Sequence, residues 1–182
     1  MKKYILYLTL PLYLLDQLTK WMVVRHFPHE TYWGEEIIVI PEFFNIVRVH
    51  NTGMAFGAFN NSPYANLAFG AVATSALVAI TVLWRRQAFP TIPSKLAASL
   101  LISGILGNLT DRLMPDRGYV VDFLDFTLPY YDKLFPTSGG HFPSFNVADS
   151  CISIAAVLLI ITAFRGEPEK EDQPPMDTNG HQ

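Results

Sequence analysis

Four long, largely apolar segments constrain this chain more than any other feature of its sequence. They extend over about residues 4–24, 64–84, 94–113 and 145–164. About 20 apolar residues in a helix cross the hydrocarbon core of a bilayer, where a helix satisfies every backbone N–H and C=O within itself. Charged residues make up 16% of the chain, against about a quarter in soluble domains. The sequence therefore predicts a mainly α membrane protein with four transmembrane helices.

The first apolar segment begins after Lys2 and Lys3, a pattern that secretory signals share. The segment is long, carries Asp16 and Lys20, and shows no small-residue cleavage motif, so we interpret it as a retained transmembrane helix. Asp16 and Lys20 are four residues apart and share a helix face, where they can form an ion pair. A structural and a functional role for this pair are both open at this point.

A smaller β region is predicted between the first two helices. The runs IIVI (37–40) and FFNIVRVH (43–50) are rich in β-branched and aromatic residues, which favours a small antiparallel sheet or hairpin on the membrane surface, within about 35–60. The following NTGMAFGAF contains Asn51 and Gly53 and is typical of a turn. Pro90 and Pro93 are expected in the connector before the third helix. Residues 1–166 form one transmembrane domain, and residues 167–182, rich in Pro, Glu, Asp and Gln, form a disordered cytoplasmic tail.

Positive charges near the helix ends set the expected orientation, because cytoplasmic loops of membrane proteins carry an excess of Lys and Arg. These residues are Lys2, Lys3, Arg85, Arg86, Lys95, Arg165 and Lys170. Both termini are therefore predicted to be cytoplasmic, with segments 25–63 and 114–144 on the outer side. The net charge of −3 offers no basic field for nucleic acid.

This topology brings Asp111, Asp122, Asp125 and Asp149 to one face of the membrane, where ionisable groups are costly unless they are paired or functional. They are separated by up to 38 positions in the chain. The expected convergence of these four aspartates is the main indication of a functional site.

Each of these aspartates can also be explained by a structural role, without a functional site. Asn146 and Asp149 have the spacing of a helix cap and its third residue, and Asn108 and Asp111 are neighbours on the third helix. Asp111 lies in the last turn of its helix, where the dipole opposes a carboxylate, so it needs a partner elsewhere or anchors a loop.

The remaining aspartates follow the third helix. Asp122 and Asp125 are predicted to point to opposite faces of one extended run, and either is a candidate for a solvated loop residue, as Asp116 and Asp132 are.

Metal and thiol chemistry are not expected. His50 and His141 show no ligand spacing such as HExxH, and Cys151 lies one turn into an apolar helix, which favours an inert buried thiol. No cofactor is predicted. A proton- or ion-coupled transporter or channel subunit is the alternative function, because such proteins use intramembrane aspartates. It predicts charges near mid-bilayer and internal repeats, and the sequence shows neither.

Five motifs in order give the chain a resemblance to a known family. They are LLDQLTKW in the first helix, NTGMAFG in the outer segment, GNLTDRL at the end of the third helix, GYVVDF after it, and FNVADS at the start of the fourth. With these the chain resembles the lipoprotein signal peptidases (signal peptidase II), membrane aspartyl peptidases of bacteria. The connector Met114–Gly118 looks slightly longer than is usual in that family.

The resemblance implies that Asp122 and Asp149 form a catalytic dyad that activates water. The supporting or substrate-binding residues that we predict are Asp16, Lys20, Asn51, Gly53, Asn108, Asp111, Arg112 and Asn146. The implied substrate is a prolipoprotein signal peptide with a lipid-modified cysteine, and membrane lipid is a further partner. A monomer in the bacterial cytoplasmic (inner) membrane, with its active site at the outer face, is expected.

Overall fold

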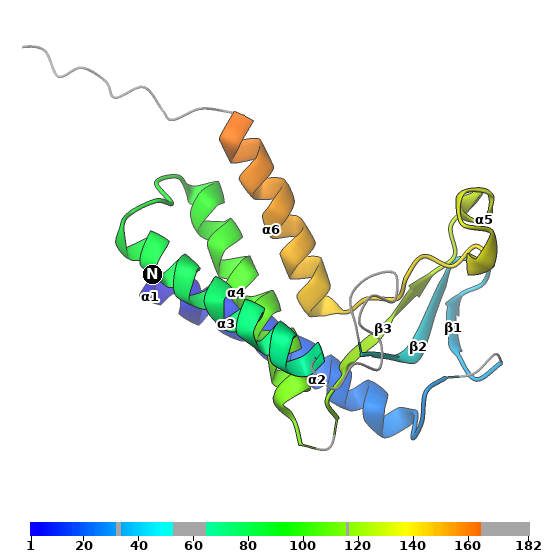
Figure 1. Cartoon of the computed structure of the whole chain (residues 1–182). Helices are drawn as coiled ribbons and strands as arrows, with labels where there is room; N and C mark the ends of the chain where they lie inside the picture. The colour runs from blue at the N-terminus through cyan, green and yellow to red at the C-terminus, as the bar shows by residue number, and fades with distance from the viewer. Residues whose placement is uncertain (32–33, 53–64, 116, 165–182) are drawn as a thin grey trace, which may run out of the picture.

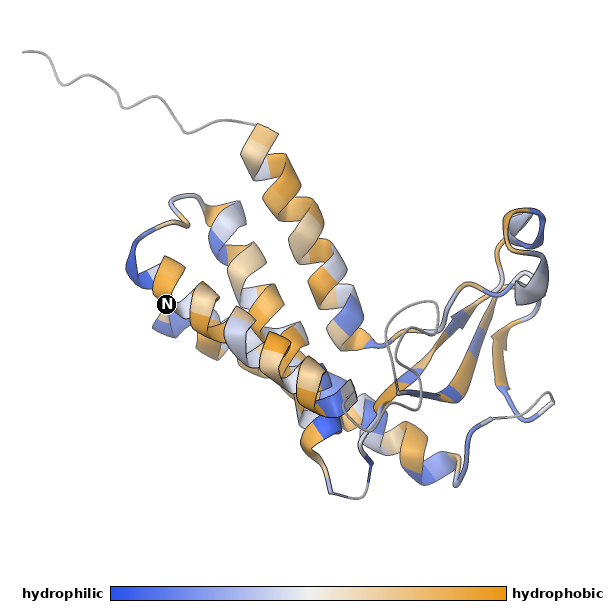
Figure 2. Cartoon of the chain, viewed as in Figure 1, coloured by the Kyte–Doolittle hydropathy of each residue, from blue (hydrophilic) through white to orange (hydrophobic). Residues whose placement is uncertain are grey.

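The computed structural model describes residues 1–31, 34–52, 65–115 and 117–164. Helices form a bundle, and a small sheet extends sideways from one end of it (Figure 1). Three helices in the described part of the chain are long and apolar enough to cross a membrane: α3 (Ala65–Arg85), α4 (Ile92–Leu113) and α6 (Val147–Phe164). Figure 2 shows that apolar residues predominate along these helices.

The fourth predicted helix is a continuous helical run at the N-terminus. It consists of α1 (Lys2–Tyr4), the π-helical η1 (Ile5–Thr9) and α2 (Leu10–His26). Pro11 lies in the first turn of α2 and has no N–H to donate to the preceding turn, which accounts for the wider π turn before it. The run buries Asp16 and Lys20 against the other helices. The predicted class, four helices with a small β segment, is confirmed.

The boundaries of two helices differ from the sequence prediction. Helix α4 begins at Ile92 and includes Pro93 in its first turn, with Thr91 as the N-cap. Proline is tolerated there because N–H groups of the first turn have no helical acceptor. Helix α6 begins at Val147, two residues later than predicted.

The sheet has three antiparallel strands in the order β1 (Ile37–Ile40), β2 (Phe44–Asn51) and β3 (Val120–Phe126). Val49 lies opposite Asp122 and Asn45 opposite Asp125, with an irregularity between Ile46 and Val49. A short helix α5 (Tyr131–Leu134) and a 3-10 turn η3 (Pro136–Ser138) lie between β3 and α6.

Two buried contacts place β3 against the bundle. Val121 and Phe123 pack on Val23 and Phe27 at the end of α2. Side chains alternate between the two faces of a strand, so Asp122, which stands between Val121 and Phe123, points to the opposite face. The strand is therefore held by one face while Asp122 projects from the other.

Small residues let α4 approach its neighbours closely. A Cβ on Gly107 would lie 2.6 Å from Asp16 Oδ2 and 2.9 Å from Ala148 Cβ. Helices α2, α4 and α6 therefore meet at Gly107, next to the aspartates described below. The predicted tail 167–182 and the turn around Gly53 lie outside the described residues.

Candidate active site

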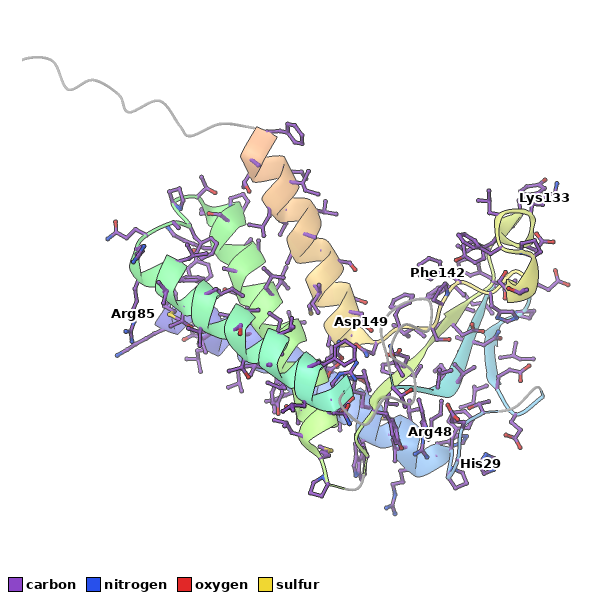
Figure 3. All side chains as sticks on the ribbon, viewed as in Figure 1. His29, Arg48, Arg85, Lys133, Phe142 and Asp149 are labelled. Carbon is purple, nitrogen blue, oxygen red and sulfur yellow. The ribbon has the colours of Figure 1, made fainter. Side chains whose placement is uncertain are left out.

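Asp122 and Asp149 come together because β3 pairs with Phe145, in the segment that leads into α6. Figure 3 shows Asp149 at the foot of α6, where the sheet meets the helices. The two carboxylates are bridged by Asn146, the residue before α6. Asn146 Nδ2 donates to Asp122 Oδ1 at 2.7 Å, and the Asn146 backbone N–H donates to Asp149 Oδ2 at 3.2 Å.

The second contact belongs to a helix cap. Asp149 N–H donates to Asn146 Oδ1 at 2.9 Å, which completes a reciprocal capping box at the start of α6. The capping interpretation of Asn146 and Asp149 is therefore right, and it does not exclude a site role. The cap fixes the Asp149 carboxylate on the side of α6 that faces Asp122.

Two further asparagines complete the shell around the pair. Asn108 Nδ2 donates to Asp149 Oδ1 at 2.7 Å, and Asn51 Nδ2 donates to Asp122 Oδ2 at 2.9 Å. Each of the four carboxylate oxygens thus accepts one N–H. Since an amide donor holds a carboxylate in place without adding charge, this shell orients the pair.

Asp122 is 2% exposed. Burial, together with the negative charge of Asp149, raises the pKa of the Asp122 carboxyl to about 7, against the lowering effect of its asparagine donors. Two neighbouring carboxyls that cannot both ionise supply an acid and a base at the same pH. The arrangement is therefore suited to activating water and protonating a leaving group.

Lys20 is fully buried beside this pair. Its Nζ lies 3.0 Å from Asp16 Oδ2 and 3.0 Å from Asp111 Oδ2, and it donates to Asn108 Oδ1 at 3.0 Å. The predicted pairing of Asp16 with Lys20 is confirmed. Because Lys20 holds the oxygen of Asn108, the amide nitrogen of Asn108 is turned toward Asp149.

Asp16 also reaches the third helix of this junction. Its Oδ1 accepts the backbone N–H of Ala148 at 2.9 Å, in the first turn of α6. The ion pair of α2 therefore positions the helix end that carries Asp149.

Asp111 has a different environment from Asp122. Besides Lys20 it contacts Arg117 Nη1 at 3.1 Å and accepts the N–H of Val121 at 3.2 Å. Both expectations for Asp111 are met, since it has distant partners and also anchors the loop into β3. Among the described residues, Asp16 is the only carboxylate that shares a partner with Asp111 in these contacts, and that partner is Lys20. Asp111 therefore supports the site and is not one of the two bridged aspartates.

The other candidates lie around the site. The guanidinium of Arg112 stacks 4.2 Å above the Phe69 ring of α3 and interacts electrostatically with Asp122 and Asp149. Asp125 points away from Asp122, as predicted, but it is buried and pairs with His141 at 2.9 Å, so its interpretation as a solvated residue is wrong.

The remaining candidates are a histidine, a thiol and a glycine. The His50 ring stacks on Tyr119, and Cys151 is buried among Ala97, Leu100 and Ala155. Gly53 lies outside the described residues. Within the described ranges, no three His, Cys, Asp or Glu side chains are arranged to hold a metal ion.

The comparison with protein families gives a clear result. The family described as Signal peptidase (SPase) II matches residues 8–165. The chain belongs to the signal peptidase II family. The match covers both bridged aspartates and every described member of the asparagine shell.

Individual members of the signal peptidase II family agree with this assignment. The lipoprotein signal peptidase of Aeromonas hydrophila is 37% identical over 170 residues, 93% of each chain. That of Shewanella amazonensis is 40% identical over 154 residues, 84% of this chain and 82% of the relative. A solved bacterial membrane enzyme superposes with a TM-score of 0.75 and 30% identity, covering 95% of this chain and 96% of its own. The protein is therefore a membrane peptidase, which decides against the transporter alternative.

Some residues that shape the site were not predicted for it. Arg117 lies in a connector without periodicity, so nothing in its spacing indicated a contact with Asp111. Gly107 precedes Asn108 in GNLTDRL, and a small residue next to Asn108 was the available signal that a close helix approach lies at the site.

Proposed function

We propose that this signal peptidase II protein cleaves signal peptides from diacylglyceryl-modified prolipoproteins, with Asp122 and Asp149 as the catalytic pair. The observation that carries the proposal is the bridge through Asn146, which holds the two carboxylates together. The curated relatives are named lipoprotein signal peptidases, which supports this substrate class.

We assign the shared proton to Asp122 and the negative charge to Asp149. Asp122 is the more buried member, and its pKa of about 7 favours the neutral acid below neutral pH. Asp149 is the third residue of α6, where the helix dipole favours an anion, and Lys20 acts on it through Asn108.

The reaction then follows from these positions. Asp149 removes a proton from the water as the water oxygen bonds to the scissile carbonyl carbon, and Asp122 protonates the carbonyl oxygen. Collapse of the tetrahedral species breaks the C–N bond, and the proton on Asp149 passes to the leaving amine. Asp122 recovers its own proton from the hydroxyl of the tetrahedral species, so the pair ends with one proton, as it began.

The location of the site agrees with such a substrate. A signal segment is apolar and enters the bilayer, while the cleaved bond lies near the interface, which is where α6 begins and α4 ends. We place both termini in the cytoplasm and the pair at the outer face of the bacterial inner membrane, with membrane lipid and the acyl chains of the substrate beside the helices. The protein acts as a monomer in this proposal.

The test uses purified protein in lipid vesicles with a diacylglyceryl-modified prolipoprotein and its unmodified form. Asp122→Asn and Asp149→Asn should each lower cleavage of the modified substrate by roughly 10²–10⁴-fold while thermal unfolding and substrate binding persist. The double variant should be little worse than either single one, because residues that act as a unit are non-additive.

Two controls make the test specific. Asp132→Asn, at an exposed aspartate of α5, should leave the rate unchanged, whereas Asp111→Asn should weaken folding along with the rate. Substantial cleavage by a well-folded Asp122→Asn protein would contradict the proposal and move the role to Asp111 or Asp125. Equal cleavage of the unmodified substrate would contradict the proposed lipid specificity alone.

A further inference from the structure

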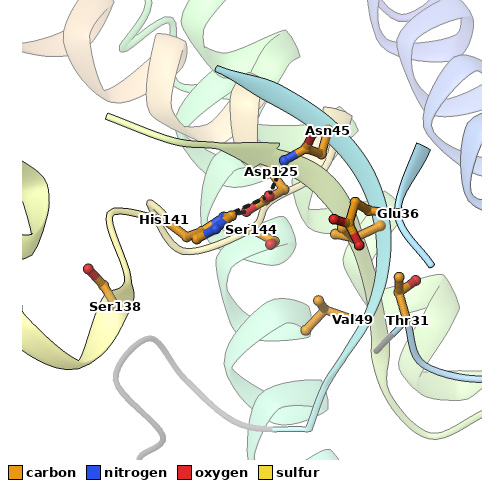
Figure 4. Close-up of a pocket in the computed structure, with 9 residues that line it drawn as sticks. Thr31, Glu36, Asn45, Val49, Asp125, Ser138, His141 and Ser144 are labelled. Carbon is orange, nitrogen blue, oxygen red and sulfur yellow. Dashed lines mark hydrogen bonds and ion pairs between the residues drawn. The ribbon is translucent and has the colours of Figure 1, made fainter. Parts of the chain in front are cut away.

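The segment between β3 and α6 forms a loop with a fixed base. Thr127 and His141 form an isolated β-bridge, and Leu128 N–H donates to Gly140 O at 2.9 Å. Figure 4 shows Asp125 held between Asn45 and His141 at this base, with Asn45 Nδ2 donating at 3.1 Å. The loop is therefore attached firmly to the sheet.

The loop tip, residues 130–135, has the opposite character. Tyr130 is 71% exposed, Leu134 is 76% exposed and Phe135 is 42% exposed. Tyr130 is the N-cap of α5 and Leu134 is its last residue, so exposed apolar side chains stand at both ends of this short helix. A fixed base that presents large apolar side chains outward indicates a surface that contacts an apolar partner.

The lysine beside an aromatic ring at the loop tip favours a lipid surface as the apolar partner. Lys133 Nζ lies 4.4 Å from the centre of the Tyr130 ring, and Figure 3 shows Lys133 at the outer end of α5. Aromatic rings with neighbouring cations are typical of membrane interfaces, where the ring lies at headgroup level and the cation meets anionic lipid.

The position of the tip agrees with a lipid surface. Figure 1 shows α5 to one side of the bundle, past α6 and at the far end of the sheet, rather than across the end of the helices. The loop leads directly into α6, whose outward side carries the exposed Ile154, Val157 and Ile160. This apolar side of α6 faces lipid, so the loop joins the bundle where α6 enters the bilayer.

We propose that the loop tip inserts Tyr130 and Leu134 into the interfacial layer of the bilayer beside α6 and anchors the far end of the sheet to the membrane. The sheet then has two attachments, one to α2 through Val121 and Phe123 and one to the lipid. This inference concerns a lipid contact and holds independently of the catalytic assignment above.

The experiment places a nitroxide label on the full chain in vesicles of phosphatidylethanolamine and phosphatidylglycerol. In a Cys151→Ala background the single introduced thiol is at Leu134→Cys, at Tyr130→Cys, or at Asp132→Cys as the matched control. Position 132 is also exposed and lies two residues, or about 200°, around α5 from position 134. Accessibility is measured to oxygen, which concentrates in lipid, and to a nickel chelate, which stays in water.

Labels at 130 and 134 should be more accessible to oxygen than to the nickel chelate, and the label at 132 should show the reverse preference. The proposal is overturned when the label at 134 shows the same preference for the nickel chelate as the label at 132. Spin–spin broadening between labels at 134, with low access for both reagents, would identify a second copy of the chain as the partner and would also overturn it. Cooperative thermal unfolding of each labelled variant, as for the unlabelled protein, checks that the chain is folded.

Discussion

Asn146 illustrates how much depends on a single side chain in this site. Its amide nitrogen holds Asp122, its amide oxygen holds the backbone of Asp149, and its own N–H holds the Asp149 carboxylate. An aspartate at this position would keep the cap but lose the donor to Asp122. Because residue 146 is an asparagine and not an aspartate, it holds the Asp122 and Asp149 carboxylates together without adding a third negative charge.

The raised pKa of Asp122 predicts the pH dependence of cleavage. In the proposed reaction Asp122 acts in its protonated form, so the rate should fall as the pH rises through about 7. Initial rates with a diacylglyceryl-modified prolipoprotein across pH 5–9 measure this. A rate that stays constant from pH 6 to 9 would contradict the assignment of the proton to Asp122.

The same shift predicts an effect on stability with a definite sign. The pKa in the folded protein is above the ordinary value of 3.8, so the folded state binds more protons than the unfolded state between about pH 4 and pH 7. This stabilisation is complete below about pH 4 and is lost as the pH rises through about 7. The melting temperature of the wild type should fall over this window, and that of Asp122→Asn should fall less.

Lys20 is expected to matter more for stability than either of its carboxylate partners. Lys20→Met leaves Asp16 and Asp111 buried without their shared cation, which costs roughly 3–5 kcal/mol for a broken buried pair. Asp16→Asn should cost less, because Lys20 keeps Asp111. Thermal unfolding of both variants in the same detergent measures the difference, and a Lys20→Met protein as stable as the wild type would contradict it.

The sequence predicted only part of this residue network. Asp16 and Lys20 are one helical turn apart, so their contact follows from helix geometry alone. The contacts of Lys20 with Asn108 and Asp111 join positions 88 and 91 residues apart. They depend on the packing of α2 against α4, which no local pattern specifies.

At the scale of elements, close helix packing at Gly107 is a testable feature. A Cβ there would lie 2.6 Å from Asp16 Oδ2, and overpacking of this kind costs about 1–3 kcal/mol. Gly107→Ala should therefore lower the melting temperature and the cleavage rate together. Gly70→Ala in α3 is the matched control, since no heavy atom lies within 4 Å of its added Cβ, and alanine is the better helix former. Equal melting temperatures for the two variants would contradict the role of Gly107.

The sheet shows what element patterns can and cannot predict. The β-branched runs 37–40 and 43–50 and the extended run that contains Asp122 indicated strands, and the structure has strands at Ile37–Ile40, Phe44–Asn51 and Val120–Phe126. The pairing of β2 with β3 was not predicted, because it joins positions 69 to 82 residues apart through a register that only tertiary packing fixes. The burial of Asp125 was missed for the same reason, since its partners Asn45 and His141 come from other segments.

For the whole molecule, the orientation in the membrane remains a prediction from charge. Reporter fusions should place residue 88 and the C-terminus in the cytoplasm, and residues 60 and 138 outside, because Arg85 and Arg86 flank the loop between α3 and α4. An external residue 88 would contradict the placement of the pair at the outer face.

The order of the helices explains how the sequence alone could predict that these aspartates lie near one another. Helices of bilayer length that alternate in direction bring the end of α4 and the start of α6 to one side whatever their detailed packing. Asp111, Asp122 and Asp149 therefore converge from topology alone. Which two of them form the pair depends on Asn146, Lys20 and Arg117, whose contacts require the folded bundle.

The interlocking of the asparagine shell has a consequence for inhibitor resistance. A compound that binds between Asp122 and Asp149 touches Asn108 and Asn146, which each serve at least two partners, so a substitution there that excludes the compound also disconnects a carboxylate or a helix end. We expect escape mutations selected against such a compound to occur away from this shell, in expression level or in peripheral lipid-facing contacts. An inhibitor confined to the shell should for this reason select resistant strains less often than one that depends on the periphery.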